Sequence, residues 1–253
     1  MKIIFFGGTD VGKKRKNNED AYLIDDKIGL YAVADGIGGS EGGEVASRIA
    51  VDALAEAIPD LLQEKDRPRI PGAGCKTESD NSLLRQAFTI ANNKIHYAAK
   101  QNPELSNMGT TLAMVLLMNE FACIAHVGDS RAYLLRSGEF KQLTADHSFV
   151  ADQLRAGVMT AEQARMSPYR HVITRALGAN GEVLPDVSQL RVQKDDRFLL
   201  CTDGLTEMVD DEDIGRILAE AAPREAVQKL LAVANNAGGV DNITAVVVWV
   251  AEM

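Results

Sequence analysis

Acidic side chains stand at the ends of apolar, strand-like runs at five places in this sequence. They are Glu19 and Asp20 before AYLID, Asp35 after LYAVA, Asp129 after ACIAHVG, Asp203 after RFLLCT, and Asp241 just before ITAVVVWV. An aspartate lowers β-propensity and is costly to bury, so one such position is ordinary, whereas five indicate a common role. Carboxylates delivered to strand ends can converge in space and bind a hard cation through oxygen. The sequence therefore predicts a metal-centred site.

Two neighbouring features extend that chemistry. Arg15 stands three residues before Asn18, and a guanidinium group can take a phosphate in two hydrogen bonds. Gly36 follows Asp35, and a glycine lets its backbone carbonyl approach closely enough to join Asp35 on a cation. Taken alone, each segment would be an ordinary polar loop or glycine turn. Together they indicate a site that combines metal ions with a phosphate.

The elements that must position these residues are strands and helices without regular β-α alternation. Pro59 is expected to end or kink the first helix near its last turn. Because strands follow one another directly, we predict an α+β fold with mostly antiparallel sheets in one domain, residues 1–253. Residues at about 63–80 are expected to form a surface loop, and the polar segment at about 146–181 an excursion from the sheet. Strands are expected at 2–6, 20–25, 28–34, 187–192, 197–201 and 243–250. A meander of four further strands is expected at 110–118, 121–127, 131–136 and 139–143. Helices are expected at 42–62, 81–100, 211–220 and 224–236.

Composition narrows the class of protein. The formal charge of −9 argues against nucleic acid as the main partner, because phosphate backbones attract clustered Lys and Arg. The longest apolar runs are too short to span a bilayer, and MKIIFFGG is too short for a signal-peptide core. The three cysteines form no CxxC pair, which fits a reducing compartment. We therefore expect a soluble, cytoplasmic protein that uses neither nucleic acid nor membrane as a partner.

A different enzyme class is suggested by residues 7–14, GGTDVGKK, which nearly match a nucleotide-binding P-loop. Lys14 occupies the Ser/Thr position whose hydroxyl would hold magnesium. The residues that follow, RKNNED, carry no apolar helical stripe, although a P-loop must open a helix. The segment is better interpreted as a turn between strands.

The ordered set of motifs resembles the metal-dependent serine/threonine phosphatases of the PP2C family, in its compact bacterial type. The resemblance covers nearly the whole chain, from about Gly7 to Val248. It implies an α-β-β-α sandwich: two packed antiparallel sheets flanked by helix pairs. The segment at about 146–181 would be a flap beside the cleft. The matched motifs are Arg15-x-x-Asn18-Glu19-Asp20, Asp35-Gly36-Ile37-Gly38-Gly39, Gly109-Thr110-Thr111, Gly128-Asp129-Ser130-Arg131, Asp146-His147-Ser148, Thr174-Arg175-Ala176-Leu177-Gly178, Asp203-Gly204-Leu205-Thr206 and Asp241-Asn242-Ile243-Thr244.

The resemblance also implies a set of metal ligands. Asp35 would bridge two Mn²⁺ or Mg²⁺ ions. Asp203 and Asp241 would complete one site, and Glu19 with the Gly36 carbonyl would serve the other. All-oxygen ligation favours these ions over zinc, which prefers His and Cys.

Further roles follow from the same resemblance. Asp129 and Asp203 would hold a weaker third ion, with Glu207 as a further candidate. Asp20 would orient metal-bound waters, and Arg15 would grip the phosphoryl oxygens. A water bridging the two cations would attack phosphorus in line, without a phosphoenzyme. The expected substrates are proteins phosphorylated on serine or threonine by a kinase, and the expected state is a monomer. The alternative is a catalytically inactive relative that binds a phosphopeptide or partner.

One departure from the family concerns the proton donor. Many members have histidine where this chain has Ile37, and that histidine is proposed to protonate the leaving group. His147 and water on the third ion are the two candidates left open. His96 and His126 are interpreted as structural, without a partner at metal-ligand spacing.

Overall fold

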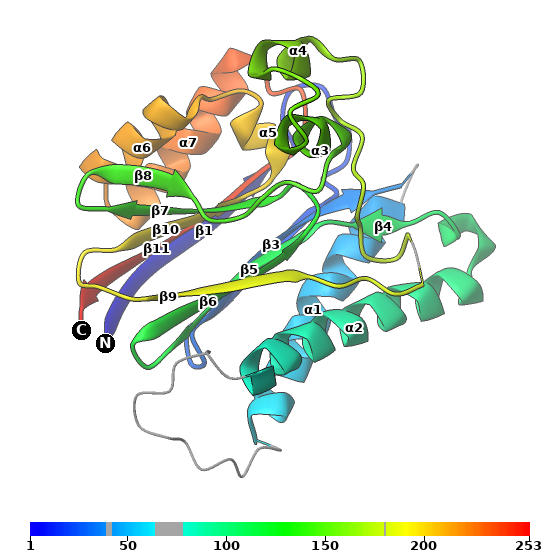
Figure 1. Ribbon diagram of the computed structural model, residues 1–253, viewed down its shortest axis with the longest axis horizontal. Coiled ribbons are helices and arrows are strands. Elements are labelled where there is room, and N and C mark those ends of the chain that lie inside the picture. Colours follow the sequence, from blue (N-terminus) through cyan, green and yellow to red (C-terminus); the bar gives the residue numbers. More distant parts are fainter. Residues whose placement is uncertain (39–41, 64–77, 180) are drawn as a thin grey trace.

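The structure is a computed structural model that describes residues 1–38, 42–63, 78–179 and 181–253. Two antiparallel sheets pack face to face, and a pair of long helices covers the outer face of each (Figure 1). The predicted fold class is therefore confirmed. Gly39 and most of the surface loop predicted at about 63–80 lie outside the described residues, as does Cys75.

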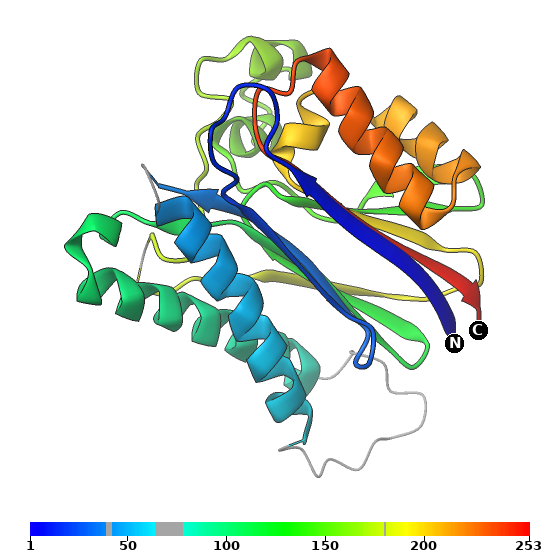
Figure 2. The same ribbon diagram turned by 180° about the vertical axis from the view of Figure 1, so that it is seen from behind.

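The first sheet has the strand order β1-β11-β10-β7-β8. β1 and β11 pair along their whole length, from Lys2 with Glu252 to Asp10 with Ile243, so the two chain termini lie side by side (Figure 2). β11 is an apolar strand that is buried along most of its length, and it lies between two strands of this sheet. The strands are β1 (Lys2–Asp10), β7 (Arg131–Arg136), β8 (Glu139–Gln142), β10 (Arg197–Cys201) and β11 (Ile243–Glu252).

The second sheet has the order β2-β3-β5-β6-β9, and the short β4 pairs with β3. The register sets Asp20, the first residue of β2, opposite Asp35 on β3. Two of the predicted acidic residues are thus brought together by strand pairing alone. The strands are β2 (Asp20–Asp25), β3 (Leu30–Ile37), β4 (Gly109–Thr110), β5 (Leu112–Met118), β6 (Phe121–Val127) and β9 (Asp186–Arg191).

Three apolar layers hold the sandwich together. One joins the helices α1 (Gly42–Gln63) and α2 (Glu78–Gln101) to the second sheet, and one joins α6 (Asp211–Glu220) and α7 (Pro223–Ala237) to the first. The third lies between the sheets, where Tyr31, Phe198 and Val248 are almost fully buried. No described helix has the length and apolar character needed to cross a bilayer.

The chain passes between the two sheets at the points where the predicted site residues stand. Residues 11–19 lead from β1 in the first sheet to β2 in the second, with no helix between them, which excludes a P-loop. Gly128-Asp129-Ser130 leads from β6 in the second sheet to β7 in the first. The predicted four-strand meander is therefore wrong: β5-β6 and β7-β8 are hairpins of different sheets, joined by this crossing.

Smaller predictions had mixed outcomes. α1 ends at Gln63, one residue beyond the expected 42–62, about one turn after Pro59. The flap segment contains α3 (Phe149–Arg155) and α4 (Ala161–Met166), and Thr160 and Gln163 form a capping box at the start of α4. Gly238 and Gly239 end α7 with positive φ, as expected of a glycine C-terminus.

Candidate metal centre

The centre of the site is the pair Asp35 and Asp203, whose carboxyl groups lie close enough to shift each other's pKa although they come from different sheets. Asp35 ends the buried part of β3, and its backbone is fixed by Thr111, whose Oγ1 accepts the Asp35 N–H at 2.9 Å. Asp203 opens the short helix α5 (Asp203–Thr206) immediately after β10. Burial raises the pKa of Asp35 well above its ordinary value, and the negative charges of Asp20, Asp203 and Asp129 raise it further. This centre is therefore short of positive charge.

Asp20 is held between the sheets by two threonines. Its Oδ2 accepts from Thr202 Oγ1 at 2.9 Å and from Thr244 Oγ1 at 2.6 Å, both from the first sheet side. Its Oδ1 is buried and has no hydrogen-bond partner among the described residues. Burial raises the pKa of Asp20 to about 7 despite the two hydroxyl hydrogen bonds, with Asp203 and Asp241 adding to the effect.

Asp129 lies at the second crossing between the sheets. Burial, and then the charges of Asp203 and Asp146, raise its pKa to about 8. Its Oδ1 is another buried oxygen that finds no partner within the described chain, and so is Oδ1 of Asp203. Unpartnered buried carboxylate oxygens are costly unless a cation satisfies them.

Glu19 and Gly36 lie against the beginning of α1. The Gly36 N–H donates to the Glu19 carbonyl at 3.1 Å, and the Ser47 hydroxyl donates to the same carbonyl at 2.6 Å. A Cβ on Gly36 would stand 2.1 Å from the Gly43 carbonyl oxygen, so only glycine fits there. Burial raises the pKa of Glu19, while Arg15 lowers it. Backbone and carboxylate oxygens are thus gathered at one edge of the centre.

Arg15 lies at the solvent edge of the cluster. Its Nη2 donates to Asp241 Oδ2 at 2.6 Å, and 52% of its side chain is exposed. Asp241 Oδ1 accepts the N–H of Asn242, whose own Oδ1 accepts the N–H of Glu19 at 2.7 Å. The arrangement leaves a guanidinium group where an incoming phosphate would meet the carboxylates.

The donor set suits a hard cation. Every acidic side chain named above offers oxygen, and three buried carboxylate oxygens lack partners among the residues described. Burial, followed by repulsion between the acids, raises the pKa values of Asp20, Asp35 and Asp129. Divalent cations such as Mn²⁺ and Mg²⁺ would satisfy these oxygens and remove the mutual repulsion. The structure brings every predicted site residue to this one end of the sandwich: Arg15, Glu19, Asp20, Asp35, Gly36, Asp129, Asp203 and Asp241.

Sequence reasoning missed His171. Its Nδ1 lies 2.7 Å from Glu207 Oε1, and these two residues and Asp203 offer ligand atoms within 4.8 Å of one another. His171 belongs to the predicted flap, so one side chain of this segment reaches the carboxylate cluster. No spacing in the sequence signals the contact, because it joins residues 171 and 207 through the folded chain.

The other histidines are placed differently from the expectation. His147 is 1% exposed, so it has no access to a substrate and is removed from the candidates for the proton donor. His126 does have neighbours at ligand spacing, namely His147 and Asp186, which corrects the prediction that it had none. The two imidazole rings are stacked, with centroids 4.5 Å apart and planes at 19°, so their lone pairs do not converge on one ion. They remain structural.

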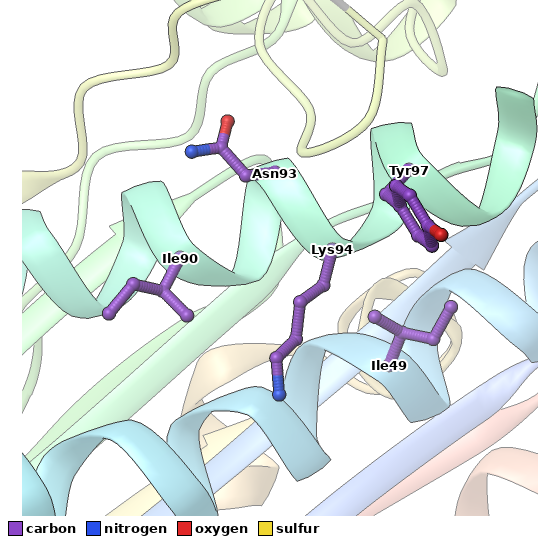
Figure 3. A pocket seen from close by; sticks show the side chains of 5 residues that line it. All are labelled: Ile49, Ile90, Asn93, Lys94 and Tyr97. Carbon is purple, nitrogen blue, oxygen red and sulfur yellow. The ribbon is translucent and has the colours of Figure 1, made fainter.

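A separate groove of about 570 Å³ lies between α1 and α2. Figure 3 shows its five lining side chains: Ile49, Ile90, Asn93, Lys94 and Tyr97. None of them belongs to the carboxylate cluster, and the surface of the groove is mostly apolar. The groove therefore takes no part in the chemistry described above.

Comparisons with known proteins agree with this site. A family model described as protein phosphatase 2C matches residues 8–239. Protein phosphatase PhpP of Streptococcus pneumoniae is 36% identical over 249 residues, which cover 95% of this chain and 94% of that protein. The serine/threonine phosphatase PstP/Ppp of Mycobacterium tuberculosis has a crystal structure that is 36% identical, with a TM-score of 0.85 and 99% of each chain covered. A second structure, of the catalytic domain of PstP in complex with two manganese ions, has a TM-score of 0.83, 35% identity, and coverage of 99% and 100%.

Proposed function

Because this chain belongs to the protein phosphatase 2C family and is a metal-dependent serine/threonine protein phosphatase, we propose that its carboxylate cluster holds the metal ions of the reaction. Asp35 would contact two Mn²⁺ or Mg²⁺ ions, Asp203 and Asp241 would complete one site, and Glu19 with the Gly36 carbonyl the other. Asp129 and Asp203 would serve a weaker third ion. The observation that supports the assignment is the set of buried carboxylate oxygens that lack partners among the described residues.

When bound, the two ions lower the pKa of a water that attacks phosphorus in line, and they neutralise charge on the phosphoryl oxygens. The protein contributes the positioning. Thr202 and Thr244 hold Oδ2 of Asp20, which leaves Oδ1 directed away from them to accept a hydrogen bond from water. The Arg15 guanidinium can donate two hydrogen bonds to phosphoryl oxygens at the solvent edge. A water route of this kind requires no phosphoenzyme.

The alternative function is an inactive module that binds a phosphopeptide or partner without hydrolysis. Such a relative is expected to have lost some of the residues on which hydrolysis depends. Arg15, Asp35, Asp203 and Asp241 are all present and lie together in one cluster. This observation favours the active enzyme.

Several finer points belong to the same proposal. The substrates are phosphorylated proteins, and we expect the enzyme to oppose a serine/threonine kinase in cytoplasmic signalling and to act as a monomer. The formal charge of −9 and the absence of CxxC pairs in the sequence support an intracellular role away from nucleic acid. Residues 1–253 are proposed to be a single domain, because strands from both ends of the chain and from its middle share the layer between the sheets.

The metal assignment can be tested by calorimetric titration of EDTA-stripped protein with MnCl₂, followed by hydrolysis of a phosphothreonine peptide by the same sample. We expect at least two ions per chain and turnover that begins only after they bind. Saturation with two ions but no turnover would instead indicate the inactive binding module. Lack of ion binding would contradict the ligand assignment itself.

Replacing Arg15 by alanine should weaken substrate binding more than it slows chemistry. We expect KM for the phosphothreonine peptide to rise roughly 10- to 100-fold, as for loss of a charge-assisted hydrogen bond, with a smaller change in kcat. Steady-state kinetics with saturating Mn²⁺ measure both constants. The matched control is Arg216→Ala, which removes an exposed guanidinium paired with Asp213 on α6 and should leave both constants unchanged. An unaltered KM in the Arg15 variant would count against its phosphate contact.

A further inference from the structure

His147 is buried beside the metal centre without belonging to it. Its Nε2 lies 3.4 Å from Asp186 Oδ2, while its Nδ1 accepts the backbone N–H of Gly128 at 3.1 Å. The ring is therefore neutral with its proton on Nε2, since Nδ1 must offer a lone pair. Burial, followed by the neighbouring His126 and Arg175, lowers its pKa to about 4, which agrees with a neutral ring.

Gly128 is held by His147 through two hydrogen bonds. In addition to the bond to Nδ1, the His147 N–H donates to the Gly128 carbonyl at 3.0 Å. Gly128 has a φ of +99°, and a Cβ there would stand 2.6 Å from Thr111 Cβ, so the backbone takes a conformation that suits only glycine. This peptide directly precedes Asp129 at the crossing between the sheets. Whatever fixes Gly128 also fixes the direction in which Asp129 leaves the strand.

The same histidine anchors both ends of the flap segment. The His147 carbonyl accepts the Thr174 N–H at 2.8 Å, and the neighbouring Ser148 forms a β-bridge with Ile173. Before it, Asp146 accepts two bonds from Arg131, at 3.0 Å to Nε and 2.7 Å to Nη2. The entrance and the exit of the flap thus meet at the residue that holds Gly128.

We propose that His147 is a positioning residue, whose Nδ1 fixes the Gly128 peptide and thereby aims the Asp129 carboxylate into the metal centre, while its backbone carbonyl holds Thr174 of the flap. The inference rests on the proposed function of Asp129 as a metal ligand. It predicts that the acceptor at the Nδ1 position, rather than the size of the ring, sets the affinity of the weaker metal site.

Two substitutions separate these properties. In His147→Asn the amide Oδ1 takes the place of Nδ1 and can accept the Gly128 N–H, whereas in His147→Gln the amide group lies toward Asp186. Calorimetric Mn²⁺ titration of the EDTA-stripped variants should give an unchanged weaker dissociation constant for His147→Asn. For His147→Gln that constant should rise roughly tenfold, as expected for one lost hydrogen bond. The control Asp186→Asn alters the contacts of Asp186 with His147 Nε2 and with Arg175 but keeps the Nδ1 acceptor, so it should leave Mn²⁺ binding unchanged.

These experiments distinguish a failure of the positioning role of His147 from a failure of the proposed ligand role of Asp129. If Asp129→Asn leaves the weaker Mn²⁺ site intact, the ligand assignment fails. If Asp129→Asn weakens the site but both His147 variants bind like wild type, the positioning role is overturned. A measurement on the unmodified protein covers the case in which the variants do not fold: ¹⁵N NMR of the histidines should show the proton on Nε2 of His147. A proton on Nδ1 would overturn the proposal.

Discussion

Substitution of Asp203 by asparagine should reduce metal-dependent hydrolysis of a phosphothreonine peptide by at least ~10³-fold, because a ligand worth several kcal/mol of transition-state stabilisation is removed. Asp203 lies close to Asp35 where the two sheets meet, and its Oδ1 is buried with no partner among the described residues. Asparagine preserves the shape of the side chain but supplies one oxygen and no charge. The loss is therefore expected in kcat and in Mn²⁺ affinity together.

The matched control for this prediction is Asp213→Asn on α6, an exposed carboxylate that pairs with Arg216. It makes the same chemical change away from the cluster and should retain wild-type kinetics. Initial rates measured over a range of Mn²⁺ concentrations separate weaker binding from slower chemistry. An Asp203→Asn enzyme within tenfold of wild type at saturating Mn²⁺ would show that the metal centre has been assigned to the wrong residues.

The second large effect concerns the stability of the metal-free protein. Asp20 and Asp129 have pKa values raised to about 7 and about 8, whereas an aspartate in an unfolded chain titrates near ~3.9. Below pH ~3.9 the two aspartates are protonated in the folded chain and in the unfolded chain alike. As the pH rises from about 4 to 8, the unfolded chain loses protons that the folded chain retains, so the free energy of unfolding falls. We expect the melting temperature of EDTA-treated protein to decrease by about 5–10 °C across this range.

Other groups also titrate over this range, so the informative quantity is the difference between wild type and Asp129→Asn. The variant lacks one of the carboxyls whose pKa is raised, so it should melt above wild type at pH 8, with little difference at pH 4. Saturating Mn²⁺ should reverse the ranking at pH 8, since cations stabilise the ionised carboxylates that they bind. Thermal melts followed by circular dichroism measure both comparisons. A metal-free Asp129→Asn variant that melts no higher than wild type at pH 8 would contradict the raised pKa of Asp129.

The sequence predicted the strands, the helices and the acidic residues because each leaves a local pattern. Apolar runs reveal buried strands such as β11, and an aspartate at the end of such a run is conspicuous. It could not predict which sheet each hairpin joins, because Gly128-Asp129-Ser130 has the composition of a tight turn and is in fact a crossing between sheets. The first helix was predicted over 42–62 and α1 ends at Gln63, because burial of Ile58 and Leu61 in the core stabilises the last turn around Pro59.

The sequence also could not predict the contacts between segments that are far apart in the chain. The hydroxyls of Thr202 and Thr244 hold Asp20, and His171 meets Glu207, yet nothing in the spacing of these residues records the distances. The family resemblance predicted which residues would form the site, but not the hydrogen bonds that orient their side chains. It also left the proton donor open between His147 and water, and the burial of His147 resolves that choice against the histidine.

The carboxylates of the centre come from both sheets, and this has a consequence beyond chemistry. Glu19 and Asp35 belong to the second sheet and its approach, whereas Asp203 and Asp241 flank strands of the first. A cation shared between them acts as a cross-link between the halves of the sandwich, and at 100 times its dissociation constant it adds about 2.7 kcal/mol to the free energy of unfolding. With the proposed ligands, the supply of manganese or magnesium would govern how long the folded chain survives proteolysis, as well as how fast it turns over substrate.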